Sequence, residues 1–81
     1  MPKLKNIGGP DVVSIFSRFG FIRASQRGSH IKLTRISSEG SKQSLTIPLH
    51  KELDKGTLIA IFRQGLKYIS EKELRPYFYS D

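Results

Sequence analysis

The sequence predicts a small α+β domain of order α-β-β-β-α, in which helices cover one face of a three-stranded antiparallel sheet. Apolar residues recur at helical spacing in two segments, and between them apolar and polar residues alternate as in strands. A polar segment rich in turn-forming residues joins two of the alternating stretches. The chain of 81 residues is long enough for one modest core. We therefore expect a single domain over residues 1–81.

The first helix is expected to begin near Gly9-Pro10-Asp11. Proline is tolerated at the first helical position, and an acid in the first turn meets the positive end of the helix dipole. Gly20 is expected to end the helix. The apolar residues that form its buried stripe are Val12, Ile15, Phe16 and Phe19.

Three strands follow, predicted over 21–25, 29–36 and 44–49, with a hairpin loop over 37–43. Side chains alternate along a strand, so His30 and Lys32, with Thr34, should lie on the open face. Pro48 cannot donate to a strand ladder and belongs at a strand end or an edge. The residues expected to face the core are Ile31, Leu33, Leu45 and Ile47.

The last third of the chain predicts a second helix that either Asp54 or Thr57 caps. Gly65 either ends this helix or permits close approach of another element. Ser70-Glu71-Lys72-Glu73 has the form of a capping box, which predicts a short helical turn to about Arg75 before Pro76 stops it. The aromatic tail over 77–79 is expected to pack on the domain.

The composition favours a polyanionic partner. The formal net charge is +7, and acids are scarce in the first fifty residues. Nucleic acid is the first candidate, a generic soluble surface the second and an anionic membrane the third. Cysteine is absent and no apolar run is long enough to span a membrane, so a cytoplasmic protein without a membrane partner is expected. The early cations are Lys3, Lys5, Arg18, Arg23, Arg27, Lys32, Arg35 and Lys42.

The turn before the second strand carries the candidate site, centred on His30. Imidazole can accept or donate a proton near neutral pH, so any proton-transfer chemistry of this protein is expected at His30. Arg27, Lys32 and the main-chain amides of Gly28 and Ser29 are candidates for binding the phosphate. No metal or small-molecule cofactor is expected, because two distant histidines without cysteine offer no usual ligand set.

Both histidines also have a structural interpretation. From spacing alone, His30 could equally be an exposed strand residue that hydrogen-bonds the turn. His50 follows Pro48 at a strand end and could line the same surface, but hydrogen bonding to a local carbonyl is the preferred interpretation.

The chain resembles the HicA family of toxins from toxin–antitoxin pairs. The resemblance implies a fold similar to double-stranded RNA-binding domains, a ribosome-independent mRNA interferase with His30 as its catalytic residue, and a HicB-type antitoxin as partner. Many relatives have a second histidine directly after the first, where this chain has Ile31, so no adjacent pair is expected. The matching segments are Gly20-Phe21, Arg27-Gly28-Ser29-His30, Pro48-x-His50, Gly56-Thr57-Leu58 and the tail from Leu74 to Tyr79.

Two function classes therefore follow from the sequence. One is a ribonuclease toxin, and the other is a non-catalytic RNA-binding module that uses the same basic face. A subunit that only binds other proteins is a third possibility, which predicts no salt-dependent affinity for RNA.

Overall fold

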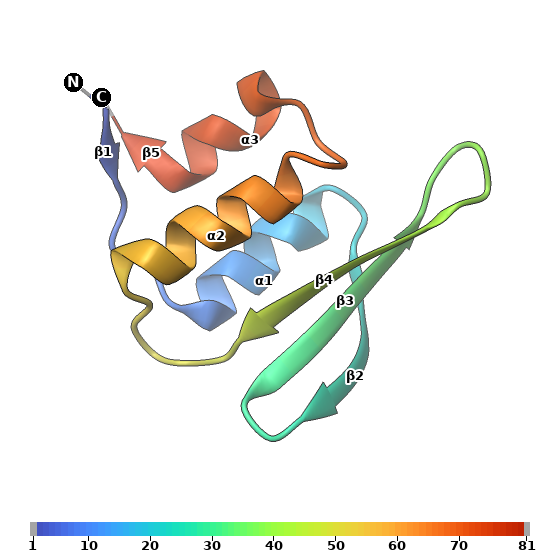
Figure 1. Cartoon of the computed structure of the whole chain (residues 1–81), viewed down its shortest axis with the longest axis horizontal. Helices are drawn as coiled ribbons and strands as arrows, with labels where there is room; N and C mark the ends of the chain where they lie inside the picture. Colours follow the sequence, from blue (N-terminus) through green and yellow to red (C-terminus); the bar gives the residue numbers. More distant parts are fainter. Residues whose placement is uncertain (1, 81) are drawn as a thin grey trace.

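The computed structural model describes residues 2–80 and contains the predicted α-β-β-β-α succession together with a third helix and two short terminal strands (Figure 1). Within these residues, no helix combines the length and the apolar character that a membrane crossing requires. The elements are β1 (Lys3–Leu4), α1 (Gly9–Arg18), β2 (Ile22–Arg27), β3 (His30–Ile36), β4 (Lys42–Pro48), α2 (Lys55–Gly65), α3 (Glu71–Phe78) and β5 (Tyr79–Ser80).

The main sheet is antiparallel with the order β2-β3-β4, as expected from three consecutive strands joined by short turns. β3 and β4 are paired along their whole length, from His30 opposite Pro48 to Ile36 opposite Lys42. The pairing of β2 with β3 shifts register between Arg23 and Ser25, which indicates a bulge in β2. Pro48 is the last residue of its strand, where its missing N–H does not interrupt the ladder.

Helices α1 and α2 cover one face of the sheet and leave the other open (Figure 1). The four core-facing strand residues, Ile31, Leu33, Leu45 and Ile47, are buried as predicted. Aromatic side chains pack between the three helices. The ring of Phe78 in α3 lies 6.0 Å from that of Phe16 in α1 and 5.3 Å from that of Phe62 in α2, measured between centroids.

The third helix is longer than predicted. Ser70 caps it as expected, with its side chain accepting a hydrogen bond from the Glu73 N–H, but the helix continues through Pro76 to Phe78 instead of stopping at Arg75. Proline removes one helical hydrogen bond, whereas its fixed φ is compatible with a helix. Phe78 is fully buried, and we attribute the extension to this burial, which offsets the lost bond.

The two ends of the described chain lie side by side (Figure 1). β1 and β5 pair antiparallel, with Lys3 opposite Ser80 and Leu4 opposite Tyr79. The tail is packed on the domain as expected. The Tyr77 ring lies 5.6 Å from that of Phe19 between centroids, in an edge-on arrangement.

Two alternatives for α2 are resolved. Asp54 is the N-cap: its carboxylate accepts the Thr57 N–H at 2.7 Å, and hydrogen bonding to Thr57 lowers the pKa of this carboxyl group. Gly65 fulfils both proposed roles, because it is the last residue of the helix and also packs closely on its neighbours. An added Cβ there would lie 2.7 Å from Leu74 Cδ2 and 2.9 Å from Phe16 Cε1.

The start of α1 packs directly against the chain that leaves β4. A Cβ at Gly9 would overlap the carbonyl oxygen of Pro48, and one at Gly8 would overlap that of Lys51. The Gly9 N–H donates to the carbonyl oxygen of His50 at 2.8 Å. This approach of two backbones requires residues without side chains.

Gly9→Ala is therefore expected to destabilise the fold by at least about 2 kcal/mol. The added Cβ would collide with main-chain atoms of Pro48 and Leu49, which have little freedom to move. Urea denaturation measures the effect. Gly56→Ala is the matched control, since it also lies in the first turn of a helix but its added Cβ would have its nearest neighbour at 3.9 Å. The control should be neutral or slightly stabilising because alanine favours helix. Equal stability of the two variants would contradict the packing described.

Candidate active site

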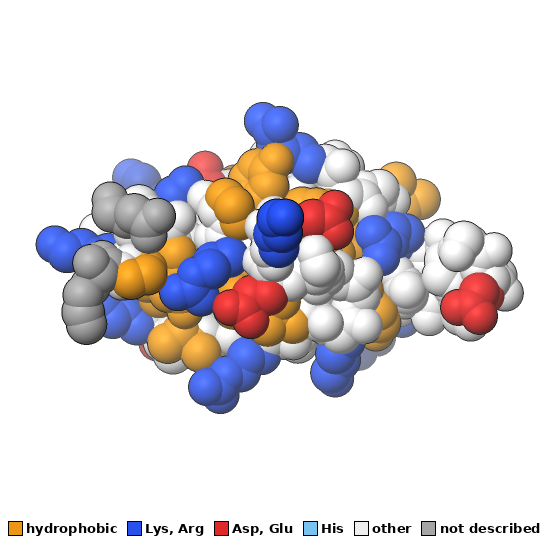
Figure 2. Space-filling model, turned by 90° about the horizontal axis from the view of Figure 1, so that it is seen from above, with side chains coloured by type: hydrophobic (Ala, Val, Ile, Leu, Met, Phe, Trp, Pro, Cys, Tyr) orange, Lys and Arg blue, Asp and Glu red, His pale blue; other side chains and the backbone are white. Residues whose placement is uncertain are grey.

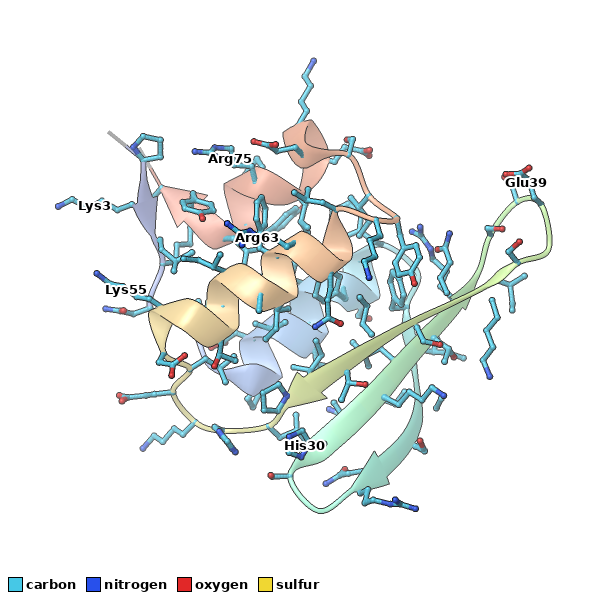
Figure 3. All side chains as sticks on the ribbon, viewed as in Figure 1. Lys3, His30, Glu39, Lys55, Arg63 and Arg75 are labelled. Carbon is cyan, nitrogen blue, oxygen red and sulfur yellow. The ribbon has the colours of Figure 1, made fainter. Side chains whose placement is uncertain are left out.

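A tight turn between β2 and β3 presents His30 at the start of β3 (Figure 3). Gly28 has φ +59°, and no other residue of the turn has a positive φ. This pattern matches a type II′ hairpin turn, which requires glycine at its first central position. The side-chain amide of Gln26 donates to the Gly28 carbonyl at 3.0 Å. The turn places Arg27 directly opposite His30.

The predicted residues gather at one end of the open face. His30 and Lys32 are both exposed there, two residues apart on β3. Ser25 and Thr46 lie opposite Lys32 on the neighbouring strands. This group contains cations and no carboxylate, so it is suited to an anionic ligand. The residues that line the depression at this end, called here the His30 face, are Ser25, Gln26, Arg27, His30, Lys32 and Thr46.

The turn also supplies main-chain donors. Within residues 2–80, the N–H groups of Gly28 and Ser29 donate to no backbone carbonyl. The Ser29 carbonyl, by contrast, accepts the Leu49 N–H, which ties the turn to the end of β4. The turn is therefore held in place while its two amides remain available to a phosphate oxygen.

The second histidine lies beside the first. The ring centroids of His30 and His50 are 6.5 Å apart, with the ring planes inclined at 68°. The local hydrogen bond expected for His50 is not formed: among the described residues its side chain has no such partner, and it lies on the surface that it shares with His30. Register could have revealed this neighbour, because pairing Leu33 with Leu45 and Ile31 with Ile47 places Pro48 opposite His30.

Arg35, one of the early cations of the sequence, does not belong to the site. It lies on the core side of β3, with its guanidinium carbon 4.8 Å from the centroid of the Phe21 ring. The guanidinium donates to the carbonyls of Phe19 at 2.8 Å and Tyr68 at 3.0 Å. The charge of Arg35 therefore stabilises the domain, through a cation–π contact with Phe21 and charge-assisted hydrogen bonds to the two carbonyls.

The opposite end of the open face carries two exposed apolar side chains. Ile22 and Ile36 are 68% and 64% exposed. Ile22 lies opposite Thr34, and Ile36 follows Thr34 by two residues on β3, so all three share the face that carries His30. Thr34 is nearly buried between its cross-strand neighbours Ile22 and Ser44. The open face thus has a cationic end at His30 and, at its other end, two exposed isoleucines together with Lys42, which lies opposite Ile36.

The surface over α3 differs from the His30 face. Figure 2 shows basic and acidic side chains interspersed there with apolar ones. A depression on this side includes the Arg75–Glu71 ion pair, with an N–O distance of 3.2 Å. Within residues 2–80, no three histidine or acidic side chains are placed to hold a metal ion together.

Comparison with known families identifies a match over most of the chain. The family model described as HicA toxin of bacterial toxin–antitoxin systems matches residues 9–66. The matched range includes α1, the whole sheet, the connection with His50, and α2, but ends before α3. Searches of curated proteins and of solved structures returned no significant match.

Proposed function

Because the chain belongs to the HicA toxin family of bacterial toxin–antitoxin systems, we propose that it is an endoribonuclease that cleaves mRNA without the ribosome. His30 is the catalytic residue of this proposal, and Arg27, Lys32 and the amides of Gly28 and Ser29 bind the phosphate. The observation that carries it is an exposed histidine between two cations on a sheet face without acidic residues.

The chemistry proposed for this site needs no metal ion or other cofactor. An imidazole can exchange protons near neutral pH. Negative charge grows on the phosphate oxygens as the 2′-oxygen attacks, and fixed cations and N–H groups stabilise that charge. Arg27 and Lys32 lie on either side of His30, one across the strand pair and one along β3, so a phosphate at His30 is within reach of both. Action on mRNA places the protein in the cytoplasm.

The first test is His30→Ala, which should lower the rate of RNA cleavage by about 10²- to 10⁴-fold. RNA binding should persist, because the cations of the His30 face remain. Cleavage is measured on end-labelled RNA, and binding by filter retention with the same RNA.

His30→Asn is the companion variant, since asparagine can hydrogen-bond the turn but does not exchange a proton. It should be as inactive as His30→Ala. Full activity of both variants would mean that His30 is not the catalytic residue, and activity restored by asparagine alone would assign His30 a structural role. RNA binding by the wild-type protein without any cleavage would favour a non-catalytic RNA-binding module.

Binding to RNA should weaken steeply with salt. Arg27→Ala and Lys32→Ala are each expected to lower the affinity and to flatten the slope of log affinity against log salt by about 0.7–0.9. Lys55→Ala removes the same charge from the first residue of α2, away from His30 (Figure 3), and should leave the slope unchanged. An affinity that does not respond to salt would assign the basic residues to a solvated surface.

Family membership implies an antitoxin as partner. We propose a HicB-type antitoxin that is acidic and covers the His30 face, competing there with RNA. Complementary charge would speed association at low salt, whereas apolar contacts would slow release. Ile22 and Ile36 supply such contacts on the same face.

Hydrogen exchange on the toxin–antitoxin complex should therefore show protection over residues 28–32 relative to the free protein. Ile36→Ser should increase the dissociation rate of the antitoxin and leave RNA cleavage unchanged. Protection confined to the helices would exclude occlusion of the site and would require inhibition by another route.

A further inference from the structure

We infer that His50 is a second catalytic residue, which shares the proton transfers of RNA cleavage with His30. This inference rests on the proposed ribonuclease function. The two imidazoles come from different parts of the chain, the start of β3 and the connection after β4, yet their centroids are 6.5 Å apart. Both side chains are exposed, so an RNA strand on the open face can reach both.

The separation suits a shared phosphate. In cleavage by an adjacent 2′-hydroxyl, the attacking and leaving oxygens lie on opposite sides of the phosphorus, so a base and an acid act best from two positions. Each must come within about 2.6–3.2 Å of its oxygen. The two rings are 6.5 Å apart with their planes inclined at 68°, an edge-on arrangement in which both are near enough to contact one phosphodiester.

The main chain of His50 is fixed although its side chain is free. The Gly9 N–H holds the His50 carbonyl at 2.8 Å, and the Leu49 N–H donates to the carbonyl of Ser29. His30 follows Ser29 directly and lies opposite Pro48. One hydrogen-bonded corner therefore sets both histidine backbones, which is the preorganisation that catalytic groups require.

The structural alternatives for His50 find no support. Its side chain is exposed, so it fills no space in the core. Among residues 2–80, it donates to no carbonyl and accepts no N–H. The hydrogen bond from α1 to His50 uses its main-chain carbonyl, which any residue would supply.

The proposed cleavage step conserves protons, because one imidazole accepts a proton and the other donates one. One imidazole, neutral, accepts the proton of the 2′-hydroxyl as the bond from O2′ to phosphorus forms. The other, protonated, donates its proton to O5′ as the bond from phosphorus to O5′ breaks. The products are a 2′,3′-cyclic phosphate and a 5′-hydroxyl, no electron transfer occurs, and the pair of histidines ends with the same total number of protons.

The test compares His50→Ala with His30→Ala on two substrates. The first is an RNA oligonucleotide with the linkage that the wild-type protein cleaves, mapped beforehand. The second is the same oligonucleotide with sulfur in place of O5′ at that linkage. A thiolate leaves without protonation because thiols are far more acidic than alcohols, so the second substrate needs no general acid.

On the oxygen substrate, at saturating concentration, His50→Ala should be slower than wild type by about 10²- to 10⁴-fold. On the sulfur substrate one of the two variants should recover to within a few fold of wild type, and the other should stay impaired. The recovered variant lacks the acid, and the impaired one lacks the base. Glu52→Gln, in the same connection, is the control and should cleave both substrates normally.

Unchanged cleavage of the oxygen substrate by His50→Ala would overturn the inference. Recovery of both variants, or of neither, on the sulfur substrate would also overturn it, since the two roles would not be divided. Circular dichroism and urea denaturation establish that each variant is folded. Loss of activity in His30→Ala with full activity in His50→Ala would leave the proposed ribonuclease intact and remove only the second histidine.

Discussion

The contact between the start of α1 and the end of β4 is the constraint on which the site depends. Gly8 and Gly9 let the two backbones touch, and the Gly9 N–H binds the His50 carbonyl. On the other side, the Leu49 N–H binds the carbonyl of Ser29, next to His30. Any shift of this corner moves one histidine relative to the other. The geometry of the site therefore depends on main-chain packing, and the side chains themselves remain free to meet a ligand.

Strand alternation divides the cations of β3 between two tasks. Lys32 lies on the open face in solvent, whereas Arg35 lies on the core side over Phe21 and binds two carbonyls. The same residue class thus contributes to ligand attraction at one position and to packing at another. A formal charge of +7 overstates the cationic surface available to a polyanion, because at least one of its charges is committed inside the domain.

The sequence predicted the sheet well, and it placed the candidate-site residues on the correct face, because both depend on local signals. The alternation around His30 and Lys32 fixes which face each residue occupies, and Gly28 fixes the turn. The continuation of α3 through Pro76 depends on Phe78 meeting rings from α1 and α2, which no local pattern reveals. The proximity of His50 to His30 depends likewise on strand register and on glycine packing far away in the chain. The missed features are therefore those that tertiary contacts create.

An open site has consequences for how such a protein is controlled. In residues 2–80, the helices lie on the far side of the sheet, and every residue of β2 is exposed, so no element of the domain covers the His30 face. Under the proposed function, inhibition would then come from another molecule. Under the proposed function, RNA and an acidic antitoxin are attracted by the same cations, so a change at Arg27 or Lys32 weakens both. Under the same proposal, the histidines would act on the bond that is cleaved, whereas attraction of both partners would rest mainly on Arg27 and Lys32. A substitution at a histidine would then alter catalysis without releasing the protein from its inhibitor, whereas a change of charge at Arg27 or Lys32 would alter both together.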